Sequence, residues 1–573
     1  MKSPRAPVPL AATLLPILLA ACSSSSPPSS DLQVGAAAVP ITPCGESSAW
    51  DGPVTGTGVW GETYTDQNGN GRYDVGEPFT DDPRNDALDA SSAGKYDGIY
   101  MAGFGNDRIA KGCHDDLWAR VLVIDDGEKR VAFTVVDLVG TLKYGRYYGF
   151  AHAEAQVDPA AGITQYVHSS THNHEGPDSL GLWGTDTLVD GKFPLYLTFV
   201  DTQLARAVSE AVADLQPVGS VRAYRTDPTE TADLRGLQVR TGCRPPFLFD
   251  EEVRGIAFFD EDGAAIASLL NWATHPESLE DENELISSDF IHWIREEVES
   301  GIGGTAVYFS ADLGASEIVG DSCVNGANPR NADGSNELDD RSNIGFARTE
   351  RIGRIVGGVL ARGLRDAPEI EAERLDVKSA HYRLASSNPT FELGREIGLL
   401  DLDPAIYDPA LCPGTNGLCG PGEQHLVTLS DDGGTPLAQI LSVPGEVFPE
   451  LYLGVATHRR TDCPAADTGA PAEPSIRDAM AAPFRFIIGL SPDEIGYIVP
   501  GYDFHPANIF DEAVDPCDGM NYDPEIPRRT VPTHYHETLS VGAEAAAYVT
   551  CKGVELLQGP EAIASEPACS VVE

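Results

Sequence analysis

The sequence has little positive charge. Its 39 Lys and Arg residues face 88 Asp and Glu residues, which gives a formal net charge of −49. No basic stripe is visible along the chain, and polyanions repel one another, so the composition argues against a nucleic-acid partner. Such acidity keeps an exported protein soluble or supports the binding of divalent cations. The charge balance therefore excludes one class of partner without naming a substrate.

Long apolar runs, internal repeats and paired cysteines are also missing. After the N-terminal segment no apolar run approaches the about 20 residues that a membrane helix needs. We find no internal repeat, and no cysteine has the close paired spacing of a zinc–thiolate site. The chain after this segment is about three and a half times the usual domain size of ~150 residues. That length is enough for a sizeable core, in one large domain or in two closely joined ones.

The first 22 residues predict export. They combine a short basic region, an apolar run too short to span a bilayer and a Leu-Ala-Ala-Cys ending at Cys22, which resembles a bacterial lipoprotein signal. We expect Cys22 to carry the lipid and to anchor the protein to a membrane, in the periplasm or at the cell surface. Residues 23–31 are rich in Ser and Pro and predict a flexible tether. The alternative is an ordinary cleavable signal with a chance cysteine.

The remaining cysteines predict structural disulfides. The chain has 11 cysteines, and the even number left after Cys22 favours disulfide pairing in an oxidising compartment. Cys412 with Cys419 would close a loop rich in Pro and Gly, and Cys551 with Cys569 would tie down the C-terminal tail. The other pairings stay open, because connectivity cannot be derived from a sequence alone.

Strand-like and helical patterns alternate irregularly along the chain. Residues 121–125 and 131–139 are apolar runs around an Asp-Gly-Glu turn and predict a hairpin. Helical periodicity covers residues 195–215, and also residues 290–298 behind a Ser-Asp cap. Further strands are predicted at residues 255–259, 264–270, 306–309 and 438–443. This alternation predicts a large mixed α/β domain.

A calcium-binding loop is predicted at residues 66–77. The segment Asp-Gln-Asn-Gly-Asn-Gly-Arg-Tyr-Asp-Val-Gly-Glu matches the twelve-residue pattern, with oxygen ligands at positions one, three, five and nine, glycine at six and glutamate at twelve. The predicted ligands are Asp66, Asn68, Asn70, the backbone carbonyl of Arg72, Asp74 and Glu77. No long amphipathic helices flank the loop, so we expect a structural ion in an insertion at about residues 60–85. The alternative is an acidic turn without a metal.

A pair of histidines marks the candidate site. The segment Thr-His-Asn-His-Glu-Gly-Pro at residues 171–177 follows a short predicted strand, and residues two apart in an extended backbone face the same side. His172 and His174 are therefore expected to face one cavity. His275 and Glu446 follow two other apolar runs, and two imidazoles with one carboxylate leave the open position of a hydrolytic zinc site. The alternatives are loop histidines that bond the backbone and a helix-capping carboxylate at Glu446.

The order of these motifs resembles the neutral ceramidase family, the zinc-dependent amidases that cleave the N-acyl bond of ceramide. The family pattern contains Thr-His-x-His-x-Gly-Pro, an Asn-Trp segment that leads to a histidine, Ile-Ser-Ser-Asp, Pro-Gly-Glu, a Gly-Tyr strand and a final tyrosine segment. In this sequence the matching motifs begin at Thr171, Asn271, Ile286, Pro444, Gly496 and Tyr535. The resemblance extends in collinear order over about residues 32–549.

The resemblance implies a role for each matching residue. His174 would act as general base and Tyr535 as oxyanion donor. It also implies one zinc-hydrolase catalytic domain at residues 32–553, with mixed sheets flanked by helices, and a tail at residues 554–573. The C-terminal β-sandwich domain of longer ceramidases is not expected here. Zinc would be held by His172, His275, Glu446 and Tyr497; the plainer alternative for both tyrosines is a core aromatic whose hydroxyl finds a partner.

The sequence departs from this pattern where the family carries a serine long discussed as a nucleophile. Glu317 stands at that position, and Ser316 lies one residue earlier. Ser316 is thus a candidate catalytic residue only through a displaced match, and an ordinary loop serine is the alternative. Residues 500–532, between the two tyrosines, look like an insertion.

Three functions remain under consideration. The first is a zinc amidase that cleaves the N-acyl bond of ceramide-like lipids and releases a fatty acid and a sphingoid base. The second is a related zinc hydrolase of another amide or of an ester, which the altered serine segment keeps open. The third is a non-catalytic surface binding protein stabilised by calcium.

Overall fold

The computed structural model describes most of the chain outside the N-terminal segment. The predicted signal after Met1, the predicted lipidation site Cys22 and the predicted tether lie outside the described residues. Most of the predicted 500–532 insertion and four further cysteines, Cys243, Cys323, Cys463 and Cys517, also lie outside them. Among the described helices, none has the length and apolar character needed to cross a membrane. The described residues are 1, 32–45, 54–55, 57–90, 92–226, 248–318, 344–412, 418–454, 468–506 and 535–572.

The first sheet has the strand order β5-β4-β3-β1-β6. Its neighbours are antiparallel except β4 and β5, which run parallel. The predicted hairpin is confirmed as β3 and β4, but β4 ends before Asp137, whose buried carboxylate accepts hydrogen bonds from the Trp118 amide and from Arg295. The strands are β5 (Gln165–Ser170), β4 (Arg130–Val136), β3 (Trp118–Asp125), β1 (Gln33–Pro40) and β6 (Gln216–Pro217).

The second and third sheets resemble the first in having a single parallel pair of strands. The second has the order β11-β9-β8-β7-β12 and the third β13-β14-β15-β17. Each contains one parallel pair, β9 with β11 and β15 with β17, and is otherwise antiparallel. The strands are β7 (Ser220–Arg225), β8 (Arg254–Phe259), β9 (Ala265–Trp272), β11 (Thr305–Ser310), β12 (Glu369–Ile370), β13 (Arg374–Ala385), β14 (Cys419–Ser430), β15 (Pro436–Ser442) and β17 (Phe484–Ile488).

Two-stranded ribbons and helices complete the fold. Both ribbons are parallel, β2 (Gly112–Cys113) with β10 (Leu285–Ile286) and β16 (Glu446–Val447) with β18 (Tyr497–Ile498). The α-helices are α1 (Pro83–Leu88), α2 (Phe150–Gln156), α3 (Pro194–Ala213), α5 (Phe290–Ile302), α6 (Phe346–Asp366), α7 (Pro389–Glu396), α8 (Pro449–Leu453), α9 (Ile476–Ala479) and α10 (Ala545–Gln558).

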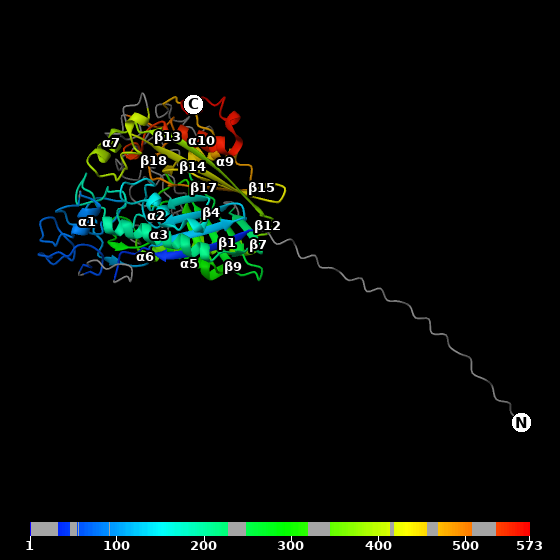
Figure 1. Ribbon diagram of the computed structural model, residues 1–573, viewed down its shortest axis with the longest axis horizontal. Coiled ribbons are helices and arrows are strands. Elements are labelled where there is room, and N and C mark those ends of the chain that lie inside the picture. Colours follow the sequence, from blue (N-terminus) through cyan, green and yellow to red (C-terminus); the bar gives the residue numbers. More distant parts are fainter. Residues whose placement is uncertain are drawn as a thin grey trace, which may run out of the picture.

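The first two sheets pack face to face between helices. Phe133 of β4 and Phe309 of β11 lie in one buried cluster, and each fully buried side chain of this size contributes about 1.5–3 kcal/mol. Helices α2 and α3 cover the outer face of the first sheet, and α5 and α6 cover that of the second. The third sheet joins the same core and is covered by α8, α9 and α10. In Figure 1 the third sheet and α10 lie above the first two sheets. The predicted mixed α/β class, with mixed sheets flanked by helices, is confirmed.

Three disulfides link described residues. Both predicted pairs form, Cys412 with Cys419 and Cys551 with Cys569, and a third joins Cys44 to Cys113. The Cys551 bridge ties the last described residues to α10. Cys44–Cys113 holds the N-terminal segment after β1 to the strand β2. Such bridges are typical of proteins that fold in an oxidising, extracytoplasmic environment.

Candidate metal centre

The candidate site lies where the parallel pairs of the three sheets end. The loops after β5, β9 and β15 carry His172, His275 and Glu446, in that order. The sheets are joined there by hydrogen bonds: Ser310 Oγ donates to the Thr171 carbonyl at 2.7 Å, and the Gly489 amide donates to the Ser310 carbonyl at 3.0 Å. Loops at the carboxyl ends of parallel strands are a general location for binding sites in α/β folds. In this protein the carboxyl ends of β5, β9 and β15 lie close together at the candidate site.

His172 lies in a strained turn immediately after β5. Its φ is +65°, in the left-handed region that residues with a Cβ rarely adopt. Its Nδ1 lies 2.6 Å from the Val139 carbonyl, which fixes the ring and leaves Nε2 for the cavity. His172 and His174 both line the cavity described below, as expected, but it is the left-handed turn at His172 that directs their side chains toward it. The strand ends at Ser170, so extended-backbone alternation is not the reason.

Glu446 brings the two histidine loops together. One of its oxygens, Oε2, lies 3.0 Å from His275 Nε2 and 3.2 Å from His172 Nε2. Burial alone would raise the pKa of Glu446, but the charge of His172 and hydrogen bonds from both imidazoles lower it to about 2. Burial lowers the pKa of His275, but its hydrogen bond to Glu446 and the charges of Glu277 and Glu446 together outweigh burial and raise it. The alternative of a helix cap does not hold, since α8 has Phe448 at its N-cap and no side-chain cap.

The donor set fits a zinc ion. Imidazole nitrogen and carboxylate oxygen bind zinc at about 2.0–2.2 Å, which separates neighbouring ligand atoms of a tetrahedron by about 3.3–3.5 Å. The separations of 3.0 and 3.2 Å around Glu446 are close to that value. All three side chains are at least nine-tenths buried. His172, His275 and Glu446 are therefore the candidate ligands of one small cation.

His174 adjoins the three ligands and has a carboxylate partner. Its ring nitrogen lies within 4.8 Å of nitrogens of His172 and His275. Its Nδ1 is 3.3 Å from Glu277 Oε2. Burial and the neighbouring charges of His172 and His275 lower the pKa of His174 well below its usual value, whereas burial raises the pKa of Glu277 to about 8. A neutral imidazole oriented by a carboxyl group can accept a proton from a reacting water.

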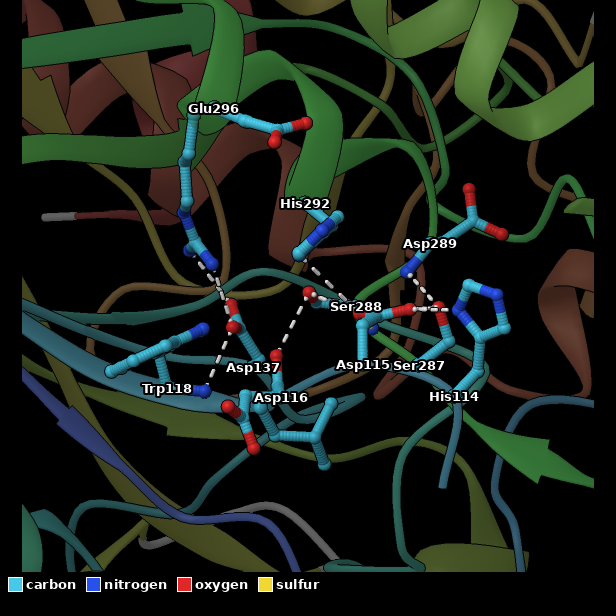
Figure 2. Close-up of polar contacts among 12 residues, drawn as sticks. His114, Asp115, Asp116, Trp118, Asp137, Ser287, Ser288, Asp289, His292 and Glu296 are labelled. Carbon is cyan, nitrogen blue, oxygen red and sulfur yellow. Dashed lines mark hydrogen bonds and ion pairs between the residues drawn. The ribbon is translucent and has the colours of Figure 1, made fainter. Parts of the chain in front are cut away.

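The Ile-Ser-Ser-Asp motif supports both histidine loops. Asn173 Nδ2 donates to the Ser287 carbonyl at 2.8 Å, and the Ser287 amide donates to the Glu175 carbonyl at 3.1 Å. Asp289 accepts from Ser278 Oγ at 2.7 Å, which ties α5 to the loop after His275. Figure 2 shows how the serines are themselves anchored, with Ser287 Oγ and the Ser288 amide both donating to Asp115. The motif is a structural brace and not a set of ligands.

The two predicted tyrosines lie beside the ligands. Tyr497 pairs with Glu446 across the β16–β18 ribbon, and its hydroxyl lies 3.4 Å from the Tyr535 hydroxyl. Tyr535 donates its own proton to the carboxylate of Glu317, which replaces the serine expected from the resemblance. Burial raises the pKa of both phenols well above the usual value. Both therefore remain protonated donors.

Ser316 has a different environment. Its hydroxyl donates to the Ala273 carbonyl at 2.9 Å, and its own carbonyl accepts a hydrogen bond of 3.0 Å from the His275 amide and lies 3.0 Å from His275 Nδ1. The side chain is fully buried and is not among the described residues that line the cavity. In this position Ser316 orients His275.

A cavity of about 670 Å³ opens above these side chains. Its floor carries His172, His174, two tyrosines and four carboxylates, and none of the described lining residues is Lys or Arg. The walls are apolar and come mainly from the loop after Pro177 and from α7 with its following turn. These wall residues include Leu180, Leu182, Trp183, Leu188, Phe391, Leu399, Leu400, Leu402, Tyr407 and Leu539. The shape suits a ligand with a long apolar part and one polar group at its end.

Comparison with known proteins agrees with this geometry. None of the protein-family models matches the chain. A neutral ceramidase from Pseudomonas aeruginosa superposes with a TM-score of 0.54 at 15% sequence identity, over 92% of this chain and 74% of that one. A ceramidase complexed with C2 gives a TM-score of 0.51 at 14% identity, over 92% and 75%. This chain has the neutral ceramidase fold. The resemblance predicted from the motifs is confirmed at the level of the fold.

The predicted calcium loop is a separate feature of this ceramidase-like chain. The Asp66 carboxylate accepts hydrogen bonds from the amides of Gly69 and Gly71, at 2.6 and 2.9 Å. Glu77 accepts from the amide of Gln67 at 2.6 Å, which closes the loop on itself. The side-chain nitrogens of Asn68 and Asn70 both donate to Asp74 Oδ2, and their side-chain oxygens accept from the backbone amides of Asn70 and Arg72.

Two residues of the ceramidase-like site were not predicted. Glu277 lies two residues after His275, and this His-x-Glu spacing, equivalent to His172-x-His174, was the available signal. Glu494 lies three residues before Tyr497, and its oxygen approaches the ligand atoms of His172 and Glu446 within 4.8 Å. Nothing in the local sequence pattern distinguishes Glu494 from a surface carboxylate, because its position depends on the packing of three sheets.

Proposed function

We propose that this protein is a zinc-dependent hydrolase that cleaves the N-acyl amide bond of ceramide-like lipids into a fatty acid and a sphingoid base. The single observation that carries the proposal is the convergence of His172, His275 and Glu446 beside an apolar cavity of about 670 Å³, which His172 and Glu446 line. The neutral ceramidase fold agrees with it.

His172, His275 and Glu446 would hold the zinc ion, with Tyr497 as the fourth ligand that the resemblance implies. Bound zinc supplies a Lewis acid for the amide carbonyl and lowers the pKa of water from 15.7 to about 7. Contacts with backbone carbonyls would fix the orientation of the two imidazoles even when no ion is bound. His172 is held by Val139, and His275 by Ser316.

His174 would move the proton. Its neutral ring takes a proton as water attacks the carbonyl carbon, and the carboxyl group of Glu277 lies 3.3 Å from Nδ1. The C–N bond then breaks, and the proton passes from His174 to the departing nitrogen, which leaves as an amine. The acyl group leaves as a carboxylate. Such proton transfer contributes about 10²–10⁴-fold to the rate.

Tyr535 would stabilise the oxygen that becomes negative during attack. Its hydroxyl is kept protonated by burial and lies at the cavity floor. Donation to substrate requires that Tyr535 exchange its present acceptor, Glu317, for the substrate oxygen. Ser316 is proposed to position His275 and not to act as a nucleophile, because its hydroxyl bonds the Ala273 carbonyl.

Three further assignments complete the proposal. The acyl chain of the lipid would lie along the apolar wall formed by residues 180–188 and 391–402. The loop at residues 66–77 would bind a structural calcium ion through Asp66, Asn68, Asn70, the Arg72 carbonyl, Asp74 and Glu77. Lipid on Cys22 would anchor the exported protein to the membrane that contains its substrate.

One observation favours a second candidate, a related hydrolase of another amide or of an ester. Glu317 occupies the hydrogen-bonding position beside Tyr535, where the resemblance implies a serine. The purified, zinc-loaded protein should be tested on a panel of ceramides, shorter N-acyl amines and acyl esters, with fatty acid release as the readout. Hydrolysis of ceramides supports the first function. Intact ceramides with cleavage of shorter amides or esters would establish the second.

A further inference from the structure

Glu494 is a buried carboxylate beside the three ligands. One of its oxygens lies within 4.8 Å of the ligand atoms of His172 and Glu446, and these atoms form a compact group of three. The residue is 7% exposed and lines the cavity. Neither its position in the sequence nor its neighbours suggested a site.

The backbone holds Glu494 in place. The Gly496 amide donates to Glu494 Oε1 at 2.6 Å, and the Glu494 amide donates to the Thr141 carbonyl at 3.2 Å. Gly140 packs so closely that a Cβ there would come within 2.6 Å of the Glu494 side chain. The same segment, residues 139–141, also fixes His172 through Val139. His172 and Glu494 are therefore positioned by one stretch of chain.

The second oxygen of Glu494 has no partner. Within the described residues Oε2 is buried and accepts no hydrogen bond. No Lys or Arg is found among the described residues of the cavity wall. Two neighbouring carboxylates in a buried site require a cation or a shared proton between them. Glu446 is already paired with the imidazoles of His172 and His275, whereas no Lys or Arg among the described lining residues offsets a second carboxylate at Glu494.

Two overlapping sets of candidate ligands share one nitrogen and one carboxylate. His172 has one available nitrogen, because Nδ1 faces the Val139 carbonyl. The set of His172, His275 and Glu446 and the set of His172, Glu446 and Glu494 therefore share that nitrogen and one carboxylate. Two separate ions would have to divide a single nitrogen between them. One ion bound by that nitrogen and by Glu446 would therefore lie next to both His275 and Glu494.

We propose that Glu494 is a direct ligand of the same divalent cation as His172, His275 and Glu446. The inference rests on the proposed zinc site and extends it. Glu494 would then take the fourth position that the resemblance gives to Tyr497. Two carboxylates would balance the double charge of zinc, so Tyr497 can keep its proton and its contact with Tyr535. The centre would then have two nitrogen and two oxygen ligands from the protein.

The test compares the zinc affinity of the wild type with that of Glu494→Gln. Affinity is measured by competition with a chromophoric chelator, and Glu317→Gln is the matched control because it removes another carboxylate of the same cavity floor. Loss of an outer-shell partner costs about 10–100-fold in metal affinity. We expect E494Q to lose more than that and E317Q to change by less than about threefold. We also expect the visible spectrum of the cobalt-substituted protein to change in E494Q.

A loss of 100-fold or less in E494Q, or an unchanged cobalt spectrum, would overturn the inference. If E494Q does not fold, a crystal structure of the wild type with zinc decides. A Glu494 oxygen at about 2.0–2.2 Å from zinc is expected, and one beyond 3 Å overturns the inference. A wild type that binds zinc and hydrolyses amides while E494Q keeps its affinity refutes this inference alone. A wild type that binds no zinc refutes the proposed function as well.

Discussion

The side chain of Asn173 donates a hydrogen bond of 2.8 Å to the main-chain carbonyl of Ser287. Asn173 is fully buried and separates the two histidines of the His-x-His segment. Ser287 belongs to a motif that also braces the loop after His275, through Asp289 and Ser278. One amide thus connects the two loops that carry the proposed zinc ligands.

We predict that Asn173→Ala weakens zinc binding without removing a ligand. Without this hydrogen bond, the turn that carries His172 and His174 should lose its fixed geometry. Zinc affinity should then fall by about 10–100-fold, as for the loss of other outer-shell partners. Chelator competition measures the effect. Gln156→Ala, which removes an exposed amide on α2, is the control and should bind zinc like the wild type. Equal affinities for the two variants would show that the brace has no role in metal binding.

His174→Ala should separate proton transfer from metal binding. The proposed role predicts a fall in kcat of about 10²–10⁴-fold with zinc content unchanged. Glu277→Gln should lower kcat in the same direction, because it alters the carboxyl group that lies 3.3 Å from Nδ1. Activity and zinc content are measured on the same preparations. Loss of zinc from His174→Ala would instead make His174 a ligand, as its distance of less than 4.8 Å from the other histidines allows.

The Lys143–Glu423 pair predicts an acid-sensitive fold. Burial would raise the pKa of Glu423, but the hydrogen bond from His425 and the charge of Lys143, 2.8 Å away, lower it far below its usual value. A carboxyl group with a lowered folded-state pKa stabilises the fold above its unfolded pKa, near 4.3. That stability is lost as the pH falls below this value.

Thermal midpoints between pH 6 and pH 3 test this prediction. The wild type should lose stability in this range more steeply than Glu423→Gln, with both proteins measured free of zinc to exclude metal release. Parallel curves for the two proteins would contradict the assignment of the acid sensitivity to Glu423.

Calcium should stabilise the protein through the loop at residues 66–77. A ligand that binds only the folded state stabilises it by about 2.7 kcal/mol at 100 times its dissociation constant. We therefore expect the thermal midpoint to rise with calcium in the wild type and not in Glu77→Gln, which lacks the bidentate carboxylate. Glu128→Gln, at the exposed hairpin turn, should respond like the wild type. Equal responses of E77Q and the wild type would place calcium elsewhere.

Local patterns predicted part of the fold. The hairpin of β3 and β4 follows from apolar runs around a turn, and α5 begins behind its Asp289 cap as expected. The disulfides of Cys412 and Cys551 were also predictable, because each closes a short loop. The Cys44–Cys113 bridge was not, since it joins segments 69 residues apart that only the folded chain brings together.

The site was predictable only where its residues lie in motifs. His172, His275 and Glu446 follow strands and occur in recognisable segments, and they meet at Glu446 Oε2. Glu494 carries no such signal, because its role depends on contacts with residues 139–141 and with Glu446. The strained turn at His172 could not be predicted either, since it arises from contacts made by the loop after β5.

The most direct test of the account is fatty acid release from ceramide by the purified protein, before and after removal of zinc. The account predicts release by the zinc-loaded wild type, loss of release on chelation, recovery on addition of zinc, and no release by His172→Ala, which should not retain zinc. Release that persists in the zinc-free protein, or a zinc-loaded protein that leaves ceramide and all other amides and esters intact, would contradict it.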